Sequence, residues 1–120
     1  MKIAFSTSGT DLNAPLDTRF GRAAKFLVYD TENATFTVVD NAQNLNAAQG
    51  AGIQSAQNVA ASGAQVLISG HCGPKAFRVL TAAGIEAYTA EAATIQEALT
   101  QFQDGKLSAL KNADVEGHWA

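Results

Sequence analysis

The residues best suited to chemistry follow one another in a single seven-residue segment, Ser69-Gly70-His71-Cys72-Gly73-Pro74-Lys75. Thiolate sulfur is a soft ligand and imidazole nitrogen a borderline-soft one, so Cys72 and His71 are candidate contacts for a metal or a metal sulfide. Gly70 and Gly73 have no side chain and let the backbone approach a ligand closely. Because adjacent residues rarely chelate one ion in tetrahedral geometry, this segment alone does not predict a zinc site.

The position of this segment in the chain also suits a ligand. Gln65–Ser69 is a compact apolar run, typical of a strand covered on both faces, and Pro74 suits the first turn of a following helix. Ligands of open α/β sheets collect at the carboxyl ends of the strands. Unpaired N–H groups at a helix start favour an anion and the thiolate form of a cysteine such as Cys72.

Plainer interpretations of the segment stay open at this point. Glycines around a proline can simply form a tight turn before a helix. A lone cysteine such as Cys72 is most often a buried, inert small hydrophobe. A loop histidine such as His71 is often only solvated.

Cations gather in two places in an otherwise acidic chain, which has 8 Lys and Arg, 11 Asp and Glu, and a net charge of −3. Five of the eight lie in two short stretches, one that follows Asp17 and one at the end of the cysteine segment: Arg19, Arg22 and Lys25 in the first, and Lys75 and Arg78 in the second. If the fold joins the two segments, they form a local positive pocket. Guanidinium groups suit oxo- and sulfido-anions. The alternative is that Arg19 pairs with Asp17 and only fastens the loop.

Gly50-Ala51-Gly52 could form a second backbone cradle for an anion at the start of a helix. It lacks the complete glycine-rich phosphate motifs, so nucleotide binding is not predicted. The alternative is that these glycines allow close packing of the helix.

Several classes of function are disfavoured by what the sequence lacks. It has no long basic run for duplex nucleic acid, and no apolar stretch near the roughly 20 residues that cross a bilayer. The chain opens without a signal-peptide pattern and holds one cysteine, so we expect a cytoplasmic protein. The first predicted strand carries no acid for a two-metal nuclease, and no Ser/His/Asp elbow occurs, so we expect no enzyme activity.

Hydrophobic periodicity and turn residues predict one domain over residues 1–120, of which residues 107–120 form a partly irregular tail. The predicted strands are Lys2–Thr7, Lys25–Asp30, Thr35–Asp40, Gln65–Ser69 and Ile85–Thr89. The predicted helices run from Gly50 to about Ser62, from Pro74 to Gly84, and from Thr94 to Phe102. The first three strands form a meander and the later ones strand–helix–strand crossovers, so we expect an α/β fold with a mixed five-stranded sheet flanked by helices.

Two details of the helices are also predicted. Phe77, Leu80 and Thr81 are expected to form the inner stripe of the second helix. Thr94 and Glu97 have the spacing of a capping box at the start of the third.

Taken together, the motifs resemble the dinitrogenase iron–molybdenum cofactor-binding family. The matching segments, which span most of the chain, are residues 1–7, 17–23, 26–30, 50–52, 68–77, 83–85 and 105–107. The resemblance implies a ribonuclease H-like three-layer fold without nuclease activity. It also implies cofactor-binding roles for Arg19, Arg22, Gly70, His71, Cys72, Gly73 and Lys75, with Cys72 and His71 as metal contacts.

From these observations we expect a non-catalytic carrier of an anionic metal–sulfur cofactor. One thiolate cannot build a four-cysteine iron–sulfur site, so a preformed cluster fits better. The resemblance includes a branch of small members that hold a molybdenum–copper sulfide cluster, so Mo–Cu and Fe–Mo types are both candidates. Expected partners are proteins that donate or accept the cluster, not nucleic acid or membrane.

Two alternatives stay open. One is a thiol-based redox or regulatory module, or a module that binds an assembly partner. The other is a hydrolase that uses Asp11, Asp17 and Asp30.

Overall fold

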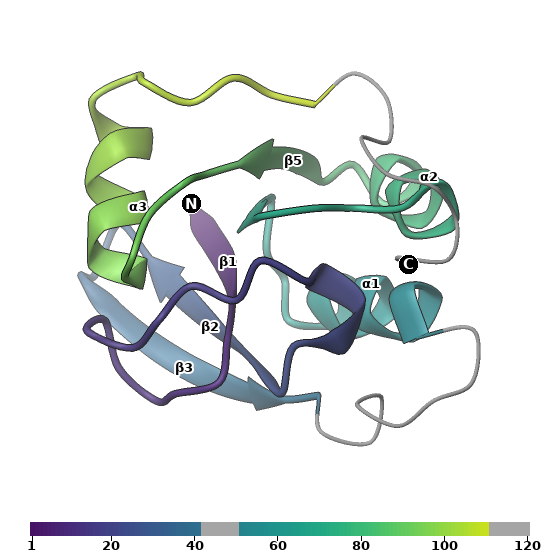
Figure 1. Cartoon of the computed structure of the whole chain (residues 1–120), viewed down its shortest axis with the longest axis horizontal. Helices are drawn as coiled ribbons and strands as arrows, with labels where there is room; N and C mark the ends of the chain where they lie inside the picture. Colours follow the sequence, from purple (N-terminus) through teal and green to yellow (C-terminus); the bar gives the residue numbers. More distant parts are fainter. Residues whose placement is uncertain (42–50, 111–120) are drawn as a thin grey trace.

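The structure is a computed structural model that describes residues 1–41 and 51–110. Within those residues five strands form one sheet in the order β3-β2-β1-β4-β5 (Figure 1). The strands are β1 (Lys2–Thr7), β2 (Lys25–Asp30), β3 (Thr35–Asp40), β4 (Val66–Ser69) and β5 (Glu86–Thr89). The β1–β2 and β2–β3 pairs are antiparallel, whereas the β1–β4 and β4–β5 pairs are parallel. The predicted mixed sheet is confirmed, and its parallel strands β1, β4 and β5 end at one edge.

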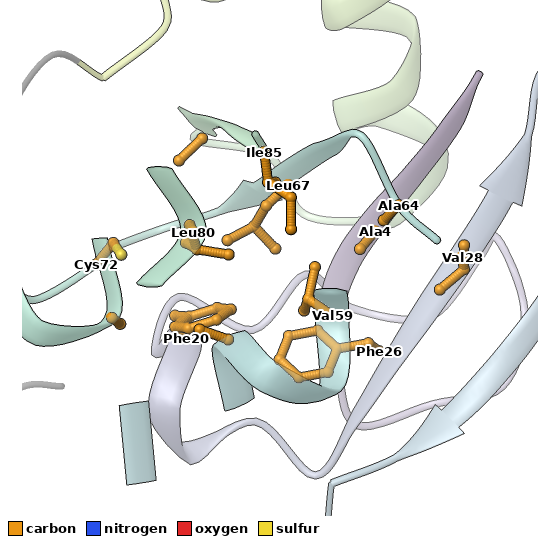
Figure 2. Packing of buried hydrophobic residues seen from close by; sticks show 13 residues of the cluster. Ala4, Phe20, Phe26, Val28, Val59, Ala64, Leu67, Cys72, Leu80 and Ile85 are labelled. Carbon is orange, nitrogen blue, oxygen red and sulfur yellow. The ribbon is translucent and has the colours of Figure 1, made fainter. Parts of the chain in front are cut away.

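Helices cover both faces of this sheet (Figure 1). The described helices are α1 (Ala51–Ala61), α2 (Pro74–Ala82), α3 (Ile95–Gln103) and a short 3-10 helix, η1 (Phe20–Arg22). Residues of η1, α1 and α2 share one buried cluster with the sheet (Figure 2). Residues of α3 share a second cluster with the other face. The sheet is therefore a middle layer, and β4, an interior strand between β1 and β5, is buried along its whole length, as a strand covered on both faces should be.

The inner face of α2 was predicted in part. Leu80 is fully buried as expected, and Phe77 is half-buried and packs against the same core cluster. Ala76, which was not predicted, is also fully buried, and it lies four residues before Leu80 on the same helix face. Thr81 is exposed, and its hydroxyl donates to the Phe77 carbonyl at 2.9 Å.

The start of β5 and the first part of the predicted tail also differ from the prediction. β5 begins at Glu86, because the Ile85 N–H donates to the Leu80 carbonyl (2.9 Å) and closes α2 instead of joining the sheet. Within the predicted tail, the Leu110 N–H donates to the Ala87 carbonyl (2.7 Å), so its first part is tied to β5. Residues 111–120 of that tail lie outside the described residues.

The first turn of α3 is satisfied by the predicted cap and by a preceding loop. The Thr94 hydroxyl accepts from the Glu97 N–H at 3.1 Å, while the Glu97 carboxylate accepts from the Ala93 N–H at 3.3 Å. The Ile95 and Gln96 N–H groups donate to carbonyls of residues 14 and 12, at 3.0 and 2.8 Å. The start of α3 is thus already occupied by protein acceptors.

Removing this cap should weaken the fold modestly. We expect Thr94→Ala to lower the free energy of unfolding by about 1 kcal/mol, because the Glu97 N–H loses its acceptor. Urea unfolding measures the change, and Thr94→Ser, which keeps the hydroxyl, is the matched control. Equal losses in the two variants would show that the hydroxyl does not act as a cap.

Candidate functional site

The loop after β1 and the loop after β4 lie against each other at the carboxyl edge of the sheet. Arg19 and His71 form an isolated parallel bridge, and the His71 N–H donates to the Thr18 carbonyl at 2.9 Å. Gly70 makes this approach possible, since a Cβ atom there would stand 2.5 Å from both Cα and O of Thr18. The cationic segment and the His-Cys segment therefore meet in space.

An open pocket of about 530 Å³ adjoins this junction. Its walls come from the loop after β1 and from the ends of β4 and β5: Thr18, Gly70, His71, Thr89, Ala90, Glu91 and Ala92. The pocket thus occupies the place where ligands collect in open α/β sheets. Its size is within the range of small-molecule sites.

The pocket lining offers hydrogen bonds and one borderline-soft nitrogen. Thr18 and Thr89 supply hydroxyls, His71 supplies an imidazole, and Glu91 adds one exposed carboxylate. Among the described residues, no group of three or more His, Cys, Asp or Glu side chains is arranged to hold a metal ion. These groups suit a metal that brings most of its own ligands.

None of the predicted cations lines the pocket, but the backbone of Arg19 pairs with that of His71, which does. The Arg19 side chain is 55% exposed, and its Nε lies 3.5 Å from Asp17 Oδ1, which also accepts from the Arg19 N–H at 2.9 Å. The loop-fastening alternative for Arg19 is thus present, and a pair whose guanidinium is exposed to solvent contributes only about 0–1 kcal/mol. Arg22 is half-buried in η1, and Lys75 is exposed in the first turn of α2.

Cys72 lies in the core and not at the pocket. It is 2% exposed and belongs to the buried cluster that includes Phe20, Ala76 and Leu80 (Figure 2). Its Sγ contacts the Gly73 carbonyl oxygen at 3.7 Å. This burial favours the interpretation of Cys72 as a small hydrophobe, because a ligand would reach its sulfur only if the loop opened.

The remaining glycine positions are largely internal. Gly73 is the buried N-cap of α2 and supplies no side-chain cap to it. Gly52 is buried in α1, which suits the close-packing alternative for that motif, while Gly50 lies outside the described residues.

The acids proposed for a hydrolase do not come together. Asp30 ends β2 opposite Lys2, at the amino end of β1, whereas Asp17 follows the carboxyl end of β1. Asp11 is exposed in the same loop as Asp17, and its carboxylate accepts from the Asn13 N–H at 2.9 Å. Asp30 is thus at the opposite end of β1 from the other two, and the three acids do not form one metal-binding group.

The residues that form one wall of the pocket were not predicted from the sequence as site residues. Thr89–Ala92 carry no motif, so only their place after the last parallel strand could have indicated them.

Comparison with known proteins assigns the chain to a family. The family model described as dinitrogenase iron-molybdenum cofactor matches residues 1–105, which include every residue of the pocket. This chain belongs to the dinitrogenase iron–molybdenum cofactor family. Membership indicates a cofactor-binding protein.

Solved structures similar to this family member share its whole fold. The apo form of the orange protein from Desulfovibrio gigas is 40% identical, with a TM-score of 0.91 over 95% of this chain and 96% of that one. An NMR structure of a Thermotoga protein, described as a proposed NifB protein, is 36% identical, with a TM-score of 0.83 over 97% and 98% of the two chains. A sequence relative, an uncharacterized protein of Methanocaldococcus jannaschii, is 34% identical over 110 residues, 89% of each chain.

Within its described residues, this family member has no helix long and apolar enough to span a membrane.

Proposed function

We propose that this protein binds a preformed, anionic metal–sulfur cluster in the pocket beside Arg19 and His71 and carries it without catalysing a reaction. The observation that carries the proposal is the junction at Gly70, which joins the backbone of Arg19 to that of His71 next to an open pocket of about 530 Å³. The family's name and the likeness to the orange protein support a cofactor of this kind.

The cations and hydrogen-bond donors of the site have roles that their chemistry allows. Arg19, Arg22 and Lys75 offset the charge of the cluster from around the pocket. His71 contacts metal or donates a hydrogen bond to sulfide, and the Thr18 hydroxyl and nearby backbone N–H groups add further donors. The sulfide of the cluster itself completes the coordination of its metals. A molybdenum- or iron-containing sulfide, with molybdenum–copper among them, satisfies these requirements.

Metal uptake by the purified apoprotein tests the proposal. Tetrathiomolybdate and copper are added, and we expect new visible absorption, with molybdenum and copper retained after desalting. Arg19→Gln should weaken retention, whereas Lys106→Gln should not, although each changes the net charge from −3 to −4. Lys106 lies beyond the far end of α3 and serves as the charge-matched control. A wild-type protein that gains no absorption and retains no metal would contradict the proposed function.

Replacement of Cys72 separates a site at the pocket from one at the thiol. We expect Cys72→Ala to retain the cluster as wild type does and to lose about 1 kcal/mol of stability, because the sulfur is a core group. Metal analysis after desalting and urea unfolding measure the two effects. Loss of the cluster from a folded Cys72→Ala variant would instead make the thiol a ligand.

The same burial bears on the thiol-based alternative, since a redox sensor needs an accessible sulfur. Mild oxidation of the native protein, followed by mass measurement, should therefore leave Cys72 without an adduct. A stoichiometric adduct without cluster uptake would favour the redox module.

A further inference from the structure

Two buried serines form a hydrogen-bonded pair next to the two loops that line the pocket. Ser6 in β1 is 0% exposed and Ser69, the last residue of β4, is 3% exposed. Their hydroxyl oxygens lie 2.7 Å apart, and the Ser6 Oγ is 2.6 Å from the Asp17 carbonyl oxygen. A carbonyl cannot donate, so the single hydroxyl hydrogen of Ser6 is given to Asp17 and the Ser69 hydroxyl donates to Ser6.

This pair connects the sheet to the loop that forms one side of the pocket. The Asp17 N–H donates to the Ser6 carbonyl at 2.8 Å, so Asp17 is held through both its N–H and its C=O. The next residue, Thr18, accepts the His71 N–H and lines the pocket. Because water does not reach the pair, it cannot replace a lost hydroxyl, and an orphaned buried carbonyl is costly.

We propose that Ser6 is a positioning residue for the pocket, and that Ser69 assists it by directing the Ser6 hydrogen toward Asp17. The pair sets the distance between the loop of Thr18 and Arg19 and the loop of Gly70 and His71. This inference rests on the proposed function for its purpose, but its structural part can be measured in the apoprotein.

Hydrogen exchange at two backbone amides tests the structural part. The His71 N–H bonds to the Thr18 carbonyl and needs the positioned loop, whereas the Ala90 N–H bonds to the Ser69 carbonyl and does not. In Ser6→Ala we expect His71 to exchange about tenfold faster relative to Ala90, since one buried hydrogen bond is lost. In Ser69→Ala, where Ser6 still donates to Asp17, the ratio should rise by a smaller factor of about three. Equal acceleration of both amides in Ser6→Ala would overturn the proposal, because it would show only a general loss of stability.

Cluster retention tests the purpose of the pair. We expect Ser6→Ala to retain tetrathiomolybdate and copper about tenfold more weakly than Val59→Ala. Val59 is buried in α1, away from the pocket, so its truncation controls for lost stability. Equal retention in these two variants would overturn the positioning role. If the wild-type protein binds no cluster, the proposed function fails, and the exchange of the two amides still tests the structural part. If Ser6→Ala does not fold, Ser69→Ala is used instead, and an unchanged ratio of His71 to Ala90 exchange in that variant overturns the positioning role.

Discussion

Phe20→Ala should lower the free energy of unfolding by about 3–5 kcal/mol, the largest loss we expect from one substitution. Phe20 is 1% exposed in the cluster between the sheet and the helices α1 and α2 (Figure 2). Its ring centroid lies 5.4 Å from that of Phe26, with the ring planes tilted by 46°. Truncation removes this contact and leaves a cavity, a large change against a typical total stability of about 5–15 kcal/mol.

The same substitution should loosen the cationic loop. Phe20 begins η1, which has no side-chain cap. Its turn is closed by two long hydrogen bonds. One runs from the Arg22 N–H to the Arg19 carbonyl (3.2 Å), and the other from the Ala23 N–H to the Phe20 carbonyl (3.4 Å). The ring is therefore a main anchor between Arg19 and Arg22. We expect weaker cluster retention in Phe20→Ala even at temperatures where the variant is folded.

Urea unfolding and metal retention measure these two effects. Leu99→Ala is the matched control, because Leu99 is 2% exposed in the cluster on the other face of the sheet. Leu99→Ala should lower the free energy of unfolding by a similar amount, about 2–5 kcal/mol, and should retain the cluster as the wild-type protein does. A Phe20→Ala variant within about 1 kcal/mol of wild type would show that the ring does not anchor the loop.

Gly70→Ala should act mainly at the pocket, where we expect it to cause the largest loss of cluster retention. The new Cβ would stand 2.5 Å from Cα and O of Thr18 and 2.7 Å from its Cβ, distances that require backbone movement. Relief of the clash separates the two loops and breaks the bond from the His71 N–H to the Thr18 carbonyl. We expect about 1–3 kcal/mol of destabilisation from overpacking. Since the pocket is built on this junction, cluster retention should be lost.

Gly105→Ala provides the control for this change. Gly105 has φ +73°, so alanine there is strained by about 1 kcal/mol, but no atom lies within 4 Å of its added Cβ. Its stability should fall while cluster retention is unchanged. Retention in Gly70→Ala equal to that in Gly105→Ala would mean that the junction of the two loops does not form the site.

Much of the fold could be predicted because its signals are local. β1, β2 and β3 lie at the predicted residues, since each is a run of apolar or β-branched residues bounded by turn-forming ones. The cap of α3 was visible in the spacing of Thr94 and Glu97. The order of strands and helices then restricts the sheet to a mixed topology.

Other features depended on contacts between residues distant in the chain. On the inner face of α2, Leu80 and Phe77 were predicted correctly, but Ala76 was missed and Thr81 is exposed, because the phase of so short a helix follows what it packs against. The thiol of Cys72 was placed with the ligand loop, but packing with Phe20, fifty-two positions earlier, draws it into the core.

The sequence by itself determined the elements, their order and the family, because these rest on periodicity, turn chemistry and motifs along the chain. Only the tertiary structure decided which of the motif residues reach a pocket. That outcome depends on the backbone contact of Gly70 with Thr18 and on the hydroxyl pair of Ser6 and Ser69 next to it. Such contacts join residues that have no relation in sequence, so no local pattern encodes them.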